Sequence, residues 1–264
     1  MPYGSQLNGR GWGIVVLLIL AGLCMTPVTA GEEALDLAGI AKILTEAETF
    51  QRMAIPKGLL SKKGPFEKGD YDPNGFLALF PRLSLEKGRV LDFVYDLQDL
   101  GGHPIVYARP GNRASFAGLA EFRKEYPRRY FLGDDVRFDP FYLGSIRTDG
   151  TPDGFLQLAM MVMRGEQFYI WWHAAYSILW PVMNRETLDD IARIFPQDQR
   201  KRVGEVDFTP HVKMNTESVT VEYVVFNAWQ GFKRIIWTVG REFPHRFIKV
   251  DEKILLPYKS PVQF

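Results

Sequence analysis

The chain has 264 residues, of which 46% are hydrophobic and 24% charged, and its 32 basic and 31 acidic side chains leave a formal net charge of +1. This length is sufficient for one packed domain, and it also leaves room for an appendage. Because the basic and acidic residues nearly balance, the net charge of the protein is too small to attract a strongly charged partner. Nucleic-acid binding normally requires an excess of basic residues, so we predict no nucleic-acid partner.

The first 30 residues have the order of a secretory signal peptide. Arg10 is followed by an apolar run, Gly13 to Met25, and then by Val28-Thr29-Ala30 before an acidic segment. A basic start, an apolar stretch too short to span a bilayer comfortably and small residues before a cleavage point are typical of such peptides. We predict cleavage after Ala30 and export to the periplasm or the extracellular space. An uncleaved N-terminal anchor is the alternative.

Removal of residues 1 to 30 takes away the only cysteine, Cys24, and one basic residue, Arg10. The mature chain then has 31 basic and 31 acidic residues, and it cannot form a disulfide, a thiol nucleophile or a cysteine metal site. An exported chain of this size without cysteine fits a bacterial envelope better than a eukaryotic secretory route. We expect no membrane span after cleavage.

The mature chain begins with a predicted helix and a connection. Apolar residues recur at three- and four-residue spacing between residues 33 and 54, which predicts an amphipathic helix that Pro56 ends. Residues 57 to 88 are rich in Gly, Pro, Lys and Asp, which predicts an irregular connection. Within it, the segment Asp72-Pro73-Asn74-Gly75 predicts a turn.

Three predicted hairpins follow, at residues 89 to 109, 154 to 173 and 219 to 239. The middle hairpin is the expected centre of the fold. Residues 155 to 163 carry apolar side chains at both odd- and even-numbered positions, and residues 168 to 172 are rich in aromatic side chains. The polar, glycine-containing segment at 164 to 167 separates these runs and favours an antiparallel pair that is covered on both faces.

Two short helices and a final strand complete the prediction. Residues 116 to 126 and residues 186 to 195 have helical character, and each range is followed by a proline. Asn184 or Thr187 is a candidate cap for the second helix. Residues 247 to 256 alternate between a largely apolar and a largely charged face, as expected of an outer strand with one side in water.

These elements predict an α+β fold, because successive hairpins without long intervening helices favour an antiparallel sheet. We expect a curved antiparallel sheet or partly open β-barrel of about seven to nine strands, with the N-terminal helix and one or two further short helices packed on it. A two-layer β-sandwich is the alternative. Residues 31 to 88 contain the helix and connection and residues 89 to 264 the hairpin-rich body, and we expect them to form one domain.

Common catalytic and phosphate-binding signatures are absent from the sequence, including G-x-S-x-G, the P-loop, G-x-G-x-x-G after a strand and H-E-x-x-H. The four histidines, His103, His173, His211 and His245, stand at no local metal-ligand spacing. We therefore predict neither a metal site nor a cofactor, and we favour a role without catalysis.

Tyr169, Trp171 and His173 are the strongest candidates for a ligand-binding site. They occupy every second position at the end of the aromatic run, so a strand would place the three side chains in a row on one face. Aromatic rings and an imidazole can orient a sugar or another small ligand. The alternative, which is the commoner role of large aromatic side chains, is that these rings fill the core.

Asp92 and Asp96 share one face of the first strand of the first predicted hairpin. If that face is enclosed, burial and mutual repulsion would push the pKa values of the two carboxyl groups apart and make them acid and base candidates. They support the alternative of an envelope hydrolase that acts on a carbohydrate or an ester.

The leading hypothesis is an exported, non-catalytic protein of the cell envelope that binds a small ligand or a protein partner on an aromatic-rich β scaffold. The first alternative is the hydrolase. The second is a structural or assembly factor, which predicts an exposed apolar patch or an unpaired sheet edge.

Overall fold

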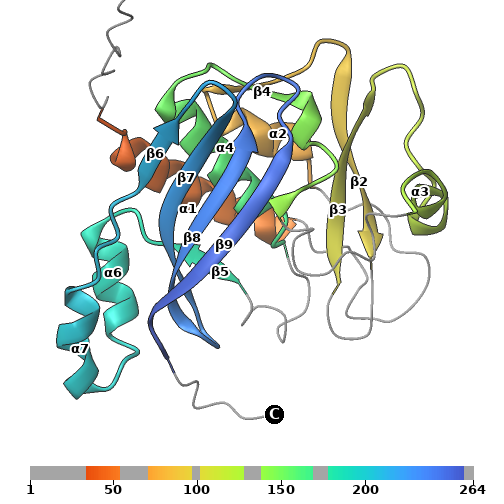
Figure 1. The fold of residues 1–264 in the computed structure, drawn as a ribbon. Helices are drawn as coiled ribbons and strands as arrows, with labels where there is room; N and C mark the ends of the chain where they lie inside the picture. The colour runs from red at the N-terminus through yellow and green to blue at the C-terminus, as the bar shows by residue number, and fades with distance from the viewer. Residues whose placement is uncertain (1–33, 54–70, 97–101, 128–137, 169–177, 259–264) are drawn as a thin grey trace, which may run out of the picture. The chain divides into compact units, whose positions relative to one another are not determined.

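The computed structural model describes residues 34 to 53, 71 to 96, 102 to 127, 138 to 168 and 178 to 258, and the predicted signal peptide lies outside these ranges (Figure 1). In chain order the helices and strands are α1 (Leu37–Met53), α2 (Pro73–Ala78), β1 (Leu83–Leu85), β2 (Arg89–Asp96), β3 (His103–Pro110), α3 (Leu119–Glu125), η4 (Leu143–Ser145), β4 (Ile146–Thr148), α4 (Pro152–Gly165), β5 (Leu179–Pro181), α6 (Arg185–Ala192), α7 (Gln197–Gly204), β6 (His211–Met214), β7 (Ser218–Asn227), β8 (Gly231–Gly240) and β9 (Phe247–Leu256). All pairings between these strands are antiparallel, which confirms the α+β class.

The largest sheet has the strand order β5-β7-β8-β9, and β6 also pairs with β7. β7 and β8 form the hairpin predicted at residues 219 to 239, with Asn227 opposite Gly231 at the turn. Gly231 has a φ of 92°, a left-handed conformation that favours glycine in such a tight connection. β9 has its predicted bounds and pairs with β8 at one end of the strand order, which confirms an outer strand.

Two smaller sheets accompany the largest one. β2 and β3 pair along their full length, which confirms the hairpin predicted at residues 89 to 109. β1 and β4 form the other sheet, with Leu83 opposite Thr148. Within the described ranges these sheets stay open, so no closed barrel forms there.

The predicted middle hairpin is wrong in its first half, because residues 152 to 165 form helix α4. Thr151 caps the helix by accepting a hydrogen bond from the Gly154 amide at 3.1 Å, and Pro152 lies in the first turn. A helix that is buried all round has apolar side chains at both odd- and even-numbered positions. Its sequence pattern therefore matches that of a strand covered on both faces. Of the predicted return strand, only Phe168 lies within the described residues.

The connection predicted at residues 57 to 88 contains two short elements, α2 and β1. The Asp72 carboxylate caps α2 by accepting a hydrogen bond from the Asn74 amide at 2.9 Å, and Pro73 lies in the first turn of the helix. The turn predicted for this segment is therefore wrong. Asp-Pro favours both structures, since an aspartate can bind the amides of a turn or of a helix start.

Three predicted helices are confirmed as α1, α3 and α6, which overlap the ranges predicted for them. The cap of α6 is Asn184, whose side-chain oxygen accepts a hydrogen bond from the Thr187 amide at 2.8 Å. Of the two candidate caps, Asn184 therefore fills the role. This cap fixes the start of α6 next to β5.

Helices cover both faces of the largest sheet. Val221 and Tyr223 of β7 share a hydrophobic cluster with residues of α1 and α4, whereas Val224 and Phe226 share another with residues of α6 and α7. Since neighbouring residues of a strand point to opposite faces, α1 and α4 pack on one face and α6 and α7 on the other (Figure 1). α1 also contacts α4, and a pocket lies beside this contact.

Candidate functional site

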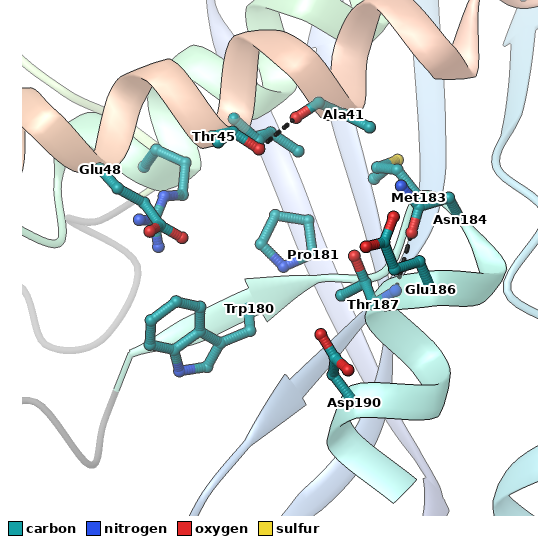
Figure 2. A pocket seen from close by; sticks show the side chains of 12 residues that line it. Ala41, Thr45, Glu48, Trp180, Pro181, Met183, Asn184, Glu186, Thr187 and Asp190 are labelled. Atoms are coloured by element: carbon teal, nitrogen blue, oxygen red, sulfur yellow. Dashed lines mark hydrogen bonds between the residues drawn. The ribbon is translucent and has the colours of Figure 1, made fainter.

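A pocket of about 250 Å³ lies where α1, the end of α4, β5 and the start of α6 meet (Figure 2). It is lined by Ala41, Leu44, Thr45, Glu48, Arg164, Trp180, Pro181, Met183, Asn184, Glu186, Thr187 and Asp190. The lining combines an indole, apolar side chains, hydroxyl and amide groups, and charges of both signs.

Regular secondary structure positions these groups. Thr45 and Glu48 lie one turn apart on α1, and Arg164 lies in the last turn of α4. Trp180 lies in β5, which is fixed by its pairing with β7, where Trp180 stands opposite Phe226. Because helices and a strand carry the lining, its side chains are better fixed than they would be on loops.

Arg164 and Trp180 form the contact between a charge and an aromatic ring at this site. Arg164 is 2% exposed, and its guanidinium carbon lies 5.4 Å from the centre of the Trp180 ring, within the range of a cation–π interaction. Burial lowers the pKa of Arg164, and the nearby Glu48 carboxylate opposes this shift. The guanidinium stays protonated, because its ordinary pKa is far above neutrality. Trp180 is 37% exposed, so part of its surface is open to a ligand.

Acidic side chains outnumber basic ones in the pocket. Glu48, Glu186 and Asp190 contribute three negative charges against the one positive charge of Arg164. Asp190 also pairs with the exposed Arg193 at 2.9 Å. Carboxylates accept hydrogen bonds from hydroxyl and ammonium groups, and an indole supplies apolar contact. This lining therefore suits a small polar ligand that presents donors, such as a sugar or an amine.

The end of α4 carries a buried acid that the sequence prediction placed in a hairpin turn. Glu166 is 7% exposed, and its Oε1 atom has no hydrogen-bond partner among the described residues. Burial raises the pKa of Glu166 to about 8, the phenol of Tyr142 opposes this shift, and the negative charge of Asp139 adds to it. Identification of α4 as a buried helix would have predicted that Glu166 is buried, since this residue directly follows the last residue of the helix.

Tyr169, Trp171 and His173 lie outside the described residues, so their role in ligand binding stays a prediction. Trp180, from the end of the same apolar stretch, lines the pocket. A sequence signal for Trp180 was its position directly before Pro181, where a regular element ends and side chains can reach the surface.

Asp92 is enclosed, with 8% of its surface exposed, and its carboxylate is surrounded by donors. Arg109 donates from Nε at 2.7 Å, the Phe93 amide donates at 2.8 Å, and the Ser115 hydroxyl also donates to Asp92. These contacts join the segment after β3 to β2. They favour a structural role for Asp92, and its role as an acid or base stays a prediction.

Asp96 is also enclosed, with 5% of its surface exposed, and it lies four positions after Asp92 on β2. An Arg123 side-chain nitrogen from α3 approaches its carboxylate to 3.9 Å. The structure thus places an arginine next to each of the two acids, which weakens the expected mutual repulsion.

None of the helices in the described ranges combines the length and the apolar character needed to cross a bilayer. Among the same residues, no group of three or more His, Cys, Asp or Glu side chains is arranged to hold a metal ion. Comparison of the chain with protein-family models, with curated proteins and with solved structures found no match. The site is therefore interpreted from its own geometry and charge.

Proposed function

We propose that the chain is an exported, non-catalytic binding protein of the cell envelope that holds a small polar ligand in the pocket between α1, β5 and α6. The observation that carries the proposal is this pocket, in which a partly exposed indole, a buried guanidinium and three carboxylates share one concave surface. The order of residues in the N-terminal segment supports export.

The size of the pocket favours a small ligand. Its volume of about 250 Å³ lies just below the range for ligand pockets, which begins at roughly 300 Å³. Trp180 would contact the apolar face of such a ligand, and the carboxylates would accept hydrogen bonds from its polar edge. A single sugar ring or a small amine meets both requirements.

The charge of the pocket discriminates between ligands. Glu186 and Asp190 lie on α6 at a spacing of four residues, so their like charges face the same side of the helix and repel each other, and the pairing of Asp190 with the exposed Arg193 reduces this repulsion. A ligand with an ammonium group relieves this repulsion, whereas an added anion increases it. We expect amines to bind most tightly, neutral sugars less tightly and polyanions least.

A thermal-shift screen of the purified protein with sugars, amino acids, amines, nucleotides and divalent metals tests the proposal. A ligand at one hundred times its Kd stabilises the folded state by about 2.7 kcal/mol, which raises the Tm of a chain of this size by roughly 5 to 10 °C. We expect such a shift with an amine or a sugar, and its loss in Trp180→Ala.

The matched control is Ile194→Ala, which removes an apolar side chain that is 51% exposed and does not line the pocket. This variant should keep the full ligand-induced shift. A shift that survives in Trp180→Ala, or the absence of a shift with every compound class, contradicts the proposal.

A role as an assembly factor is the second candidate, and β9 favours it. This outer strand carries Ile248 and Ile254, which are 51% and 54% exposed. Apolar side chains on a sheet edge promote pairing with another chain. Analytical ultracentrifugation tests this candidate: concentration-dependent association that is lost in Ile254→Lys supports it, and a monomer at all concentrations removes its basis.

A further inference from the structure

Three polar groups that the proposed function does not use lie together at the end of α4. They are the carboxyl group of Glu166 and the phenols of Tyr71 and Tyr142, and all three side chains are buried and interact electrostatically. In the described part of the chain, Glu166 Oε1 and both phenolic oxygens have no close hydrogen-bond partner, although the Tyr142 phenol lies near enough to favour an ionised Glu166. Buried polar atoms without partners destabilise a fold, so a group of three indicates a specific role.

The position of Glu166 disfavours its charged form. The carboxyl group is buried, with 7% of the residue exposed, and the gap beside the two phenols has no room for a water molecule. Glu166 also follows the last residue of α4, and the negative end of a helix dipole repels a carboxylate there.

Within the described ranges, the titratable groups that act on Glu166 bring no compensating positive charge. Those that act on the three buried groups are Asp72 at the start of α2, Tyr95 in β2, Asp139 before η4, and Tyr142 itself. Arg164, two positions before Glu166, lies over the Trp180 ring in the pocket. The neutral acid is therefore the form that fits, in agreement with a pKa that burial raises to about 8.

The residues on both sides of Glu166 hold the walls of the pocket. Arg164 lines the pocket from the last turn of α4. Gln167 accepts a hydrogen bond from the Leu179 amide at 2.6 Å, and its side-chain nitrogen donates to a carbonyl of α4 at 2.7 Å. Leu179 precedes Trp180 in β5, and Glu166 directly precedes Gln167, so a movement of Glu166 out of its buried position would disturb the contact between Gln167 and Leu179.

We propose that Glu166 is a proton-controlled switch on the pocket: the neutral acid stays buried and keeps the α4–β5 junction closed, whereas the carboxylate must leave and thereby releases the junction. The predicted loss of ligand binding rests on the proposed function. The opening of the α4–β5 junction does not rest on the proposed function. An experiment can therefore contradict the switch and the proposed function independently.

The direction of the pH dependence follows from linkage. The carboxyl group has its ordinary pKa of 4.5 in an open form and a pKa of about 8 in the closed form. The closed form therefore binds more protons between these values, and the opening equilibrium constant rises about tenfold per pH unit as pH increases. The rise ends above about pH 8, because both forms are then ionised.

Amide hydrogen exchange at Leu179, measured by NMR at pH 5.5 and pH 7.5, tests the switch. This amide is bonded to Gln167, so it exchanges when the junction opens. After division by the intrinsic exchange rate, we expect roughly 70-fold faster exchange at the higher pH. In Glu166→Gln, which keeps a neutral group of the same shape, we expect the same corrected rate at both pH values.

The matched control is Glu46→Gln, which neutralises an exposed acid on α1 that pairs with Lys42. The 70-fold increase should persist in this variant. A corrected rate in the wild type that changes less than threefold overturns the proposal even if Glu166→Gln does not fold. An equal increase in Glu166→Gln overturns it as well. Failure of every ligand in the thermal-shift screen, with a normal Leu179 response, would remove the proposed function and leave the switch intact.

Discussion

Asp92 and Glu166 are buried to nearly the same extent, with exposed fractions of 8% and 7%, yet their surroundings differ. Asp92 forms an ion pair with Arg109 at 2.7 Å and receives a hydrogen bond from Ser115. Glu166 lies near the phenols of Tyr71 and Tyr142, and its Oε1 atom has no hydrogen-bond partner among the described residues. The comparison shows that burial alone does not assign a role to a carboxyl group, because the partners decide which charge state the fold accepts.

The largest effect is expected when Asp92 loses its carboxylate. Asp92→Ala leaves the Arg109 guanidinium, whose side chain is 19% exposed, without its ion-pair partner. Removal of one member of a buried pair destabilises a fold strongly, so we expect a loss of about 3 kcal/mol in the free energy of unfolding, measured with urea. A loss below about 1 kcal/mol would mean that Asp92 does not hold the segment after β3 in the way described.

The next effect concerns Glu166 and pH. Its pKa is raised from 4.5 to about 8 in the folded state, so the folded chain binds more protons between these values and stability falls as pH rises. Relative to Glu166→Gln, the wild type should lose about 2.5 kcal/mol of unfolding free energy between pH 5.5 and pH 7.5. If the unfolding free energies of the two proteins changed with pH in parallel, Glu166 would titrate in the folded state like an ordinary surface acid, and this prediction would be wrong.

A smaller effect is expected at Ser115, which supplies a single hydrogen bond to Asp92. Ser115→Ala should reduce the free energy of unfolding by about 1 kcal/mol, since Arg109 and the Phe93 amide still satisfy the carboxylate. The additional effect of Ser115→Ala in an Asp92→Ala background should be close to zero, because the partner is already absent. Full additivity in this double-mutant cycle would show that the two side chains act independently.

The smallest change in stability is expected for Tyr142→Phe, because the phenolic oxygen that it removes has no hydrogen-bond partner in the described part of the chain. We expect a change within about 0.5 kcal/mol at pH 5.5. The phenol can donate a hydrogen bond to an ionised Glu166 and thereby lowers its pKa. Its removal should therefore raise this pKa, so that the pH-dependent loss of stability ends at a higher pH. A downward displacement would contradict the stated interaction between the two groups.

The sequence predicts the strands of the body more reliably than its buried helix. A clear turn identifies β7 and β8, and alternation identifies β9. The expected covered face of β9 is wrong, because Ile248 and Ile254 on its apolar face are 51% and 54% exposed. α4 lacks a polar face, and a pattern without a polar face cannot distinguish a helix from a strand. The cap Thr151 and the following Pro152 contained the missing information, because they start a helix in the same way as Asp72 and Pro73 do.

The pocket could not be predicted from local sequence patterns. Arg164 and Trp180 come from a helix and a strand that meet because β5 pairs with the far end of β7. Burial raises the pKa of Glu166, and Tyr142, a residue that precedes α4 in the chain and packs against its far end, opposes this rise. Such relations depend on tertiary packing, whereas sequence patterns report local periodicity.

The most direct test of the difference between the two carboxyl groups is a pH titration of Glu166 in the intact protein. The chemical shift of its side-chain carboxyl carbon is measured by ¹³C NMR at each pH. We predict a midpoint near pH 8, with Glu166→Gln used to assign the signal. A midpoint close to the ordinary value of 4.5 would contradict the account, because it would show that the fold accepts Glu166 as a carboxylate and that the junction between α4 and β5 does not respond to its charge.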